Sequence, residues 1–297
     1  MAWVYLSIAA AAFQTLRFVL QKRLSMGTLS AGGATFARFV YSAPFITALA
    51  MLALGGAPMP ELAPGFWAYA LTGGGAQIGA TWCVVALFAR RNFAVGITLK
   101  KTEVVQTALV GMLVLGDRVS ATATAAIVLG LVGVLALSDL PSVTGGRIRR
   151  IFNPSAGLGL LSGALFAVSA VCYRGATLAV DSDDALLRAV LTLAAVTLSQ
   201  TVAMSAWLAW REPGQLARVA QAWRGAIWIG LAGLAGSLCW FTAFTLQNAA
   251  LVFAVGQVEV IFSLLASVLI FRERITPREA GGIALLTGSI LMLVWLG

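Results

Sequence analysis

Ten long apolar runs divide this sequence, and they constrain its fold more than any other feature. A bilayer core of roughly 30 Å needs about 20 apolar residues per spanning helix, which is close to the length of each run. Of the 297 residues, 60% are hydrophobic and 10% are charged, whereas soluble domains carry roughly 25% charged residues. The sequence therefore predicts an all-α polytopic membrane protein with ten transmembrane helices. They are expected at Trp3–Gln21, Ser30–Leu54, Gly65–Ala89, Phe93–Leu115, Ala121–Leu137, Ser155–Val180, Asp184–Trp210, Ala226–Leu246, Ala250–Phe271 and Pro277–Trp295.

The charged residues and cysteines exclude several classes of protein. The net charge is +9, but the basic residues lie mostly in short gaps between apolar runs, without the interleaved aromatic residues of a nucleic-acid site. Cys83, Cys172 and Cys239 fall inside apolar runs without paired spacing, and the chain has no histidine. We therefore expect no disulfide, metal, cofactor or nucleic-acid partner. No basic segment precedes the first apolar run, so that run should remain as a helix.

Two glutamates mark an internal repeat. Glu103 and Glu259 lie inside apolar runs, and each is followed fourteen residues later by an acid–arginine pair, Asp117–Arg118 and Glu273–Arg274. The tetrapeptide Phe-Ala-Val-Gly precedes both glutamates, at 93–96 and 253–256, with four extra residues in the first copy. Internal self-similarity in an apolar chain is typical of a transporter with two related halves around a central site. Weaker similarities pair Arg38 with Arg188, Phe13 with Phe166, and Gly79 and Trp82–Cys83 with Gly236 and Cys239–Trp240.

One basic segment joins the two halves. We place five helices in residues 1–138, a cytoplasmic linker at 139–154 that holds Pro141 and three arginines, and five helices in residues 155–297. Because five is odd, the second half enters the membrane from the opposite side, so the repeat is predicted to be inverted. Lys and Arg concentrate in the odd-numbered loops, which should be cytoplasmic. We therefore expect a multi-pass protein of a bacterial-type inner membrane with both termini external.

This arrangement resembles the drug/metabolite transporter superfamily, in particular its ten-helix EamA-type exporters. The resemblance is carried by the segment from Leu115 to Ser120 (LGDRVS), by its counterpart from Phe271 to Thr276 (FRERIT), and by the Gly-containing apolar helix after each. It implies a secondary active transporter that exports a small metabolite by alternating access through a central cavity. Many similar members export amino acids, some with a preference for aromatic ones. The alternatives are a carrier of cationic drugs or other metabolites in the same superfamily, or a passive channel.

Polar faces on two helices indicate where a pathway lies. Lys100, Glu103 and Thr107 share one face of the fourth helix, and Glu259 and Ser263 form the equivalent face of the ninth. A charge facing lipid at the bilayer centre costs at least roughly 2.5 kcal/mol, so both faces should point into the bundle. Aromatic walls with a few hydrogen-bonding groups would suit an amphipathic ligand. The predicted cavity residues are Gln77, Thr81, Trp82, Lys100, Glu103, Thr107, Trp240, Glu259 and Ser263, with lipid-facing positions as the alternative for both tryptophans.

The two glutamates have different neighbours in the sequence. Lys100 lies three residues before Glu103 on the same helix face, so local neutralisation is one interpretation of that acid. Glu259 has no basic residue within one helical turn. It is therefore the candidate for proton coupling, for binding a substrate amine, or for a cross-helix ion pair with Lys100 or Lys101.

The arginines near helix ends have two interpretations. Arg17, Arg38, Arg174 and Arg188 lie nearer helix ends than the glutamates do, and their long side chains favour anchoring at the membrane surface. The alternative is a gate or a contact to a substrate carboxylate, for which the candidates are Gln14, Arg17, Arg38 and Tyr41. The acid–arginine pairs at 117–118 and 273–274 should organise turns.

An enzyme is the rival from another class, and the sequence disfavours it. There is no histidine, the aspartates fall in loops or at helix ends, and no set of nucleophile, base and orienting group accompanies the glutamates. The expected partners are a small-molecule substrate, the lipid bilayer and, as a candidate coupling ion, the proton; a monomer would suffice.

Overall fold

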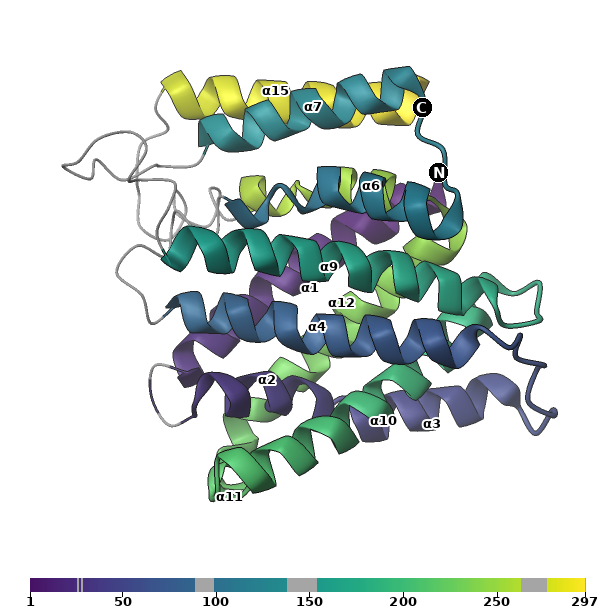
Figure 1. Cartoon of the computed structure of the whole chain (residues 1–297), viewed down its shortest axis with the longest axis vertical. Helices are drawn as coiled ribbons and strands as arrows, with labels where there is room; N and C mark the ends of the chain where they lie inside the picture. The colour runs from purple at the N-terminus through teal and green to yellow at the C-terminus, as the bar shows by residue number, and fades with distance from the viewer. Residues whose placement is uncertain (26, 28, 89–98, 138–153, 263–276, 297) are drawn as a thin grey trace.

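The structure is a computed structural model of the chain, and it describes all residues except 26, 28, 89–98, 138–153, 263–276 and 297 (Figure 1). Its elements are helices, and the one isolated β-bridge within this part joins Leu62 to Val180. The helices are α1 (Ala2–Ser25), α2 (Ala31–Val40), α3 (Ala43–Leu54), α4 (Phe66–Phe88), α6 (Glu103–Leu115), α7 (Ala121–Leu137), α9 (Pro154–Leu178), α10 (Ala185–Arg211), α11 (Gln215–Gln221), α12 (Trp223–Leu246), α13 (Ala249–Gly256) and α15 (Pro277–Leu296).

These helices follow the predicted apolar runs and confirm an all-α polytopic membrane protein. Six of the described helical spans are long and apolar enough to cross a membrane, and four shorter apolar helices accompany them. The second run is divided at Tyr41 and Ser42 into α2 and α3, which follow each other along one span. Pro44 lies in the first turn of α3, where its missing N–H needs no partner. The short helix α11 lies between predicted runs and is not expected from hydropathy.

The fourth and ninth predicted helices are interrupted, and in both a glutamate begins the next helical segment. Residues 101–102 form a turn before α6, which starts at Glu103. Residues 257–258 form a turn after α13, and helix resumes at Glu259. The prediction of one unbroken helix across each glutamate is therefore wrong; residues 93–98 and 263–271 of these runs lie outside the described part. A carboxylate at a helix start is stabilised by the unpaired amides and the helix dipole, which favours a break at these two points.

Helices of the two halves pack in a pattern that respects the repeat. α1 packs on α12, and the counterpart of that pair is α9 on α4. α2 and α3 pack on α10, α6 packs on α13, and α7 packs on α15, so each of these helices contacts its own counterpart (Figure 1). If each helix is replaced by its counterpart in the other half, the same set of helix contacts results. The halves are thus interlocked, with α6 and α13 between the α7–α15 pair and the other helices.

Two glycines allow equivalent helix pairs to approach closely. A Cβ added to Gly79 of α4 would lie 3.1 Å from Leu165 Cδ1 of α9. A Cβ added to Gly236 of α12 would lie 3.2 Å from Phe13 Cβ of α1. Small residues are common at helix contacts in membranes because they let the backbones approach. These counterparts in the repeat therefore have the same packing role in the two halves.

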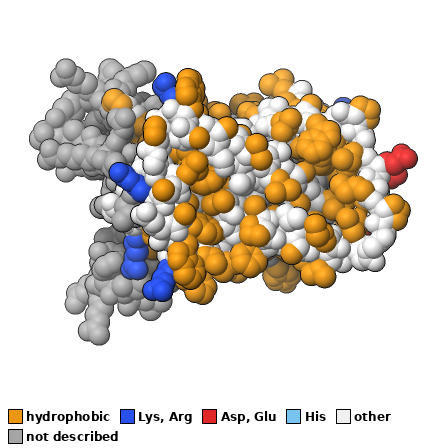
Figure 2. All heavy atoms as spheres, turned by 90° about the horizontal axis from the view of Figure 1, so that it is seen from below, with side chains coloured by type: hydrophobic (Ala, Val, Ile, Leu, Met, Phe, Trp, Pro, Cys, Tyr) orange, Lys and Arg blue, Asp and Glu red, His pale blue; other side chains and the backbone are white. Residues whose placement is uncertain are grey.

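The character of the surface side chains changes from one end of the helices to the other (Figure 2). Figure 2 shows hydrophobic side chains over the middle of the molecule, with most visible lysines and arginines at one end and acidic side chains at the other. Both chain termini lie at the end opposite the basic side chains (Figure 1). An apolar belt between two polar ends is the surface expected of a protein that spans a bilayer.

Candidate functional site

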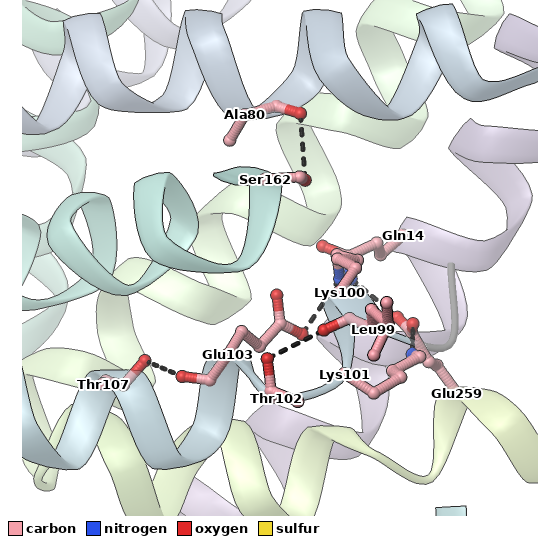
Figure 3. A network of polar contacts seen from close by, with 10 residues as sticks. All are labelled: Gln14, Ala80, Leu99, Lys100, Lys101, Thr102, Glu103, Thr107, Ser162 and Glu259. Atoms are coloured by element: carbon pink, nitrogen blue, oxygen red, sulfur yellow. Dashed lines mark hydrogen bonds and ion pairs between the residues drawn. The ribbon is translucent and has the colours of Figure 1, made fainter. Parts of the chain in front are cut away.

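Two lysine–glutamate pairs lie where α13 meets the start of α6 (Figure 3). Lys100 Nζ is 2.9 Å from Glu103 Oε1 of the same chain segment. Lys101 Nζ forms an ion pair with Glu259 Oε1 of the other half. Gln14 Nε2 of α1 donates to the second carboxylate oxygen of Glu259 at 2.6 Å. Consecutive lysines thus neutralise the glutamates of both halves.

These four charges are buried in the bundle. The side chains of Lys100 and Glu103 are 3% and 6% exposed, and those of Lys101 and Glu259 are 5% and 13% exposed. An unpaired charge at such a place would be strongly destabilising, so pairing is what keeps the lysines there. The predicted local pairing of Glu103 agrees with this geometry. Of the alternatives for Glu259, the structure has the cross-helix ion pair, and Lys101 is its partner.

Arg17 and Arg38 are buried, which corrects their expected anchoring at the membrane surface. They are only 2% and 5% exposed, because α1 and α2 pack on α12 and direct these side chains into the bundle. Arg38 donates through Nη1 to Thr81 Oγ1 at 3.2 Å and through Nη2 to Ser237 Oγ at 3.0 Å. Arg17 Nη1 donates to Gln21 Oε1 at 2.6 Å. Within the described residues, neither guanidinium has a carboxylate within ion-pair distance.

A glycine of α12 brings the two arginines together. A Cβ added to Gly233 would lie 3.0 Å from Arg38 Cγ and 3.4 Å from Arg17 Cδ, so both side chains cross the same gap. Like charges repel strongly where little water screens them. This part of the bundle therefore has a positive potential that an anion would reduce.

A cavity borders Arg38. Its volume is about 20 Å³, room for little more than one water molecule, and a second cavity of about 10 Å³ shares Arg38 and Ser237 with it. A larger ligand therefore requires the surrounding side chains or helices to move apart. Trp240 in its wall is stacked on Phe244, with ring centroids 5.7 Å apart, and Phe253 lies edge-on to both rings. The wall is therefore largely aromatic. The described residues that line it are Gln14, Arg38, Gln77, Phe166, Ser169, Ala170, Tyr173, Ser237, Trp240, Phe241, Phe244 and Phe253.

The polar groups of this wall are rich in hydrogen-bond donors. Arg38 contributes a guanidinium, and the Nε1–H of Trp240 is buried without a hydrogen-bond partner among the described residues. None of the described lining residues is acidic. An apolar ligand with a negative group would match both features of the wall.

Two lining residues connect the cavity to the ion pairs. Gln14 lines the cavity and donates to Glu259. Phe166 also lines it, and Lys100 Nζ lies 4.9 Å from the centroid of its ring. A ligand that moved either side chain would therefore disturb the surroundings of an ion pair.

Trp82 does not line this cavity, contrary to the sequence prediction. It is 45% exposed and lines a separate groove between α4 and α10. The repeat explains this position, because Trp82 follows Gly79 by three residues whereas Trp240 follows Gly236 by four. One residue along a helix is a rotation of about 100°. The counterpart of the inward-facing Trp240 is therefore Cys83, which is 5% exposed.

Gln77 and Thr81 lie with the central polar groups. Thr81 accepts the hydrogen bond from Arg38, and Gln77 lines both cavities. Gln77 Oε1 also accepts from Tyr173 OH and from Gln200 Nε2, each at 3.0 Å. The sequence prediction did not include Tyr173 or Gln200. Both residues could have been identified from the sequence as polar side chains inside apolar runs.

Several other predicted site residues that the structure describes are not among those lining the two cavities: Arg17, Tyr41, Thr81, Lys100, Glu103, Thr107 and Glu259. Thr107 is buried, but its hydroxyl donates to the backbone carbonyl of Glu103 at 2.6 Å. Tyr41 OH donates to the carbonyl of Val219 in α11 at 2.9 Å, so this hydroxyl stabilises a helix contact. Ser263 lies outside the described residues.

The remaining arginines stabilise helix ends. Arg174 Nη1 donates to two backbone carbonyls at the end of α12, at 2.7 and 2.8 Å. Its Nε is 3.3 Å from Asp117 Oδ2, so Asp117 contacts α9 as well as forming part of its own turn. Arg188 donates to a backbone carbonyl in the loop before α10. Arg174 and Arg188 therefore bind protein carbonyls, as cations near helix ends commonly do.

Comparisons with known proteins agree with this architecture. Residues 154–295 match the EamA-like transporter family. No curated protein matches the sequence. A solved crystal structure of another protein superposes on this one with a TM-score of 0.68 and a sequence identity of 16%. The match covers 97% of this chain and 99% of the other. At this identity the likeness shows a shared fold over nearly the whole length. Residues 154–295 are therefore similar to an EamA-like transporter domain, and the chain shares the fold of the solved structure.

Proposed function

We propose that this protein is a secondary active transporter that exports small carboxylate-bearing metabolites, including amino acids with aromatic or other apolar side chains. The observation that carries this proposal is Arg38. Its guanidinium borders an aromatic cavity, and among the described residues its hydrogen bonds go only to hydroxyls. Guanidinium and carboxylate form strong two-point hydrogen bonds. Arg38 would hold the carboxylate of the substrate while the aromatic wall contacts its apolar part.

The interlocked halves support alternating access rather than a passive channel. Each half contributes an interrupted helix, and the two breaks lie beside the buried ion pairs. Interrupted helices beside a central site, contributed by two related repeats, are typical of secondary transporters. The repeat architecture would supply two related conformations that open to opposite sides.

A carrier of cationic compounds is the second candidate, and the described charges disfavour it. In the described part of the chain, four basic side chains are buried (Arg17, Arg38, Lys100 and Lys101), and the acids paired with them are Glu103 and Glu259. A cationic substrate would add to this excess in a region of weak screening. An anionic group would reduce it.

We also propose that Glu259 couples transport to an ion or to the substrate. Gln14 contacts both this carboxylate and the cavity, so a ligand in the cavity and the Lys101–Glu259 pair share a neighbour. Protonation of Glu259 would weaken its attraction to Lys101 and release a contact between the halves. This step would give protons a route to influence transport.

The orientation of the chain follows from its charge distribution. We propose a bacterial-type inner membrane, with the basic end of the molecule in the cytoplasm and both termini outside. A reporter fused after Gly297 should therefore read as external. A cytoplasmic reading would overturn this orientation.

Transport by purified protein in sealed liposomes tests the function. We expect saturable uptake of labelled phenylalanine that is stimulated by unlabelled phenylalanine on the opposite side. Arg38→Gln should lower this uptake at least about tenfold because it removes a buried charge contact. The matched control is Arg188→Gln, at the repeat counterpart, which should change uptake less than about twofold. Flux without saturation or counterflow would indicate a channel, and an active Arg38→Gln variant would remove Arg38 from the site.

A further inference from the structure

The buried charges of the described residues do not cancel. The two lysine–glutamate pairs beside α6 and α13 are each neutral as a unit. Arg17 and Arg38 remain, and both are buried without a described carboxylate within ion-pair distance. Among the residues that the structure describes, the interior around the cavity therefore has an excess of two positive charges. A bound monocarboxylate would reduce this excess, whereas a zwitterion would leave it unchanged.

The described cavity wall offers little to an ammonium group. An ammonium has three donors and needs acceptors. Gln77 Oε1 already accepts hydrogen bonds from Tyr173 and Gln200. Glu259 is held by Lys101 and by Gln14, and Gln14 is the member of that group that lines the cavity. No described residue of the lining is acidic. The amino group of an amino acid would thus lose water without gaining a carboxylate partner.

The aromatic wall also favours an uncharged contact. The rings of Trp240 and Phe244 stack with an interplanar angle of 14°, and Phe253 lies edge-on to both. A cation binds best over an open ring face, but these faces are partly covered by neighbouring rings. The guanidinium of Arg38 in the same wall would repel a second cation. The rings are better placed to contact the hydrocarbon part of a ligand.

We infer that the cavity selects apolar monocarboxylates by their negative charge, so that an organic acid without an amino group binds more tightly than the amino acid with the same side chain. This inference rests on the proposed function, because it concerns the same cavity, and it narrows the substrate class. Arg38 binds the carboxylate. The aromatic wall binds the rest of the molecule, and the α-amino group weakens binding.

Three ligands with one phenyl ring separate the contributions of the two charged groups. They are 3-phenylpropionate, phenylalanine and phenethylamine, which carry the carboxylate only, both groups, and the amine only. Binding is measured by isothermal titration calorimetry at neutral pH, with the full chain in lipid nanodiscs so that membrane leakage of the acid has no effect. We expect 3-phenylpropionate to bind at least about tenfold more tightly than phenylalanine, and phenethylamine not to bind, because an uncompensated buried charge opposes each amine.

The outcomes distinguish this inference from the proposed function. If phenylalanine binds more tightly than 3-phenylpropionate, the cavity recognises the amino group and the inference is wrong, although an amino-acid carrier remains. If phenethylamine binds and the acids do not, both the inference and the carboxylate carrier are wrong. Tighter binding of 3-phenylpropionate, with phenylalanine counterflow in liposomes, supports both.

A carboxylate placed in the wall should reverse the preference. Ser169 lines the cavity, so Ser169→Asp would supply an acceptor for the amine and offset the charge of Arg38. We expect this variant to bind phenylalanine at least as tightly as 3-phenylpropionate. Ser169→Asn is the matched neutral control and should keep the preference for the acid. A Ser169→Asp variant that is folded and ranks the ligands as the original chain does would contradict the charge argument.

Discussion

The two halves of the chain place a glutamate at the same point of the repeat but give it different partners. Glu103 pairs with Lys100 of its own segment. Glu259 pairs with Lys101 of the other half and also accepts a hydrogen bond from Gln14 of α1. One glutamate therefore balances a local charge, whereas the other links three chain segments. Both glutamates begin a helical segment at the same point of the repeat, but they contact different partners.

This difference matters for a carrier. Contacts between the halves must change when access alternates, whereas contacts within one helical segment can stay intact. The Lys101–Glu259 pair is of the first kind, and the Lys100–Glu103 pair is of the second. We therefore expect Glu103 to contribute mainly to stability and Glu259 mainly to transport.

The largest expected effect concerns stability at the local pair. Glu103→Gln leaves Lys100 buried without its acid, which should lower the free energy of unfolding by about 3–5 kcal/mol. Glu259→Gln is the matched variant and should cost less, because the side chain of Glu259 is 13% exposed and that of Glu103 is 6%. Thermal unfolding of the purified variants checks the order. A larger loss at Glu259 would reverse the proposed division of roles.

Removing both charges of each pair separates stability from transport. Lys100→Met with Glu103→Met should leave stability and uptake nearly unchanged, since a buried ion pair contributes little beyond an apolar replacement. Lys101→Met with Glu259→Met should also fold but should transport at least about tenfold more slowly, because a fixed apolar contact between the halves cannot respond to charge. Unfolding temperature and liposome uptake are measured on both double variants. Equal uptake by the two would mean that the cross-half pair has no special part in transport.

The pH dependence of uptake sharpens the comparison further. If Glu259 takes up a proton during transport, Glu259→Gln should abolish the pH dependence of uptake, whereas Glu103→Gln should keep it in the molecules that remain folded. Initial rates in liposomes over a range of pH give the result. Unchanged transport and unchanged pH dependence in Glu259→Gln would remove this glutamate from coupling.

The smallest effects are expected at the two tryptophans. Trp240→Phe removes the buried indole N–H from the cavity wall and should weaken substrate binding about fivefold, the value of roughly one hydrogen bond. Trp82→Phe changes a side chain in the outer groove and should alter binding less than about twofold. Calorimetry with 3-phenylpropionate measures both. A larger effect of Trp82→Phe would place the ligand in the groove between α4 and α10.

The sequence was informative where a property depends on neighbours along one helix. Lys100 and Glu103 are three residues apart, and this spacing alone predicts that they can meet. The sequence also indicates that the two tryptophans face different directions, because Trp82 follows Gly79 by three residues and Trp240 follows Gly236 by four. Arg38 was harder, since its position near the end of a helical segment favoured the surface, and only the packing of α2 on α12 shows that it is buried.

By itself, the sequence determined the all-α membrane fold and the existence of two related halves, because apolar length and internal similarity are properties of the chain alone. The tertiary structure decided which charges cancel. Lys101 and Glu259 are far apart in the sequence and meet only when the halves interlock, while Arg17 and Arg38 are buried without a described acid. Charge compensation depends on distance in space and on exclusion of water, and neither is fixed until the helices pack.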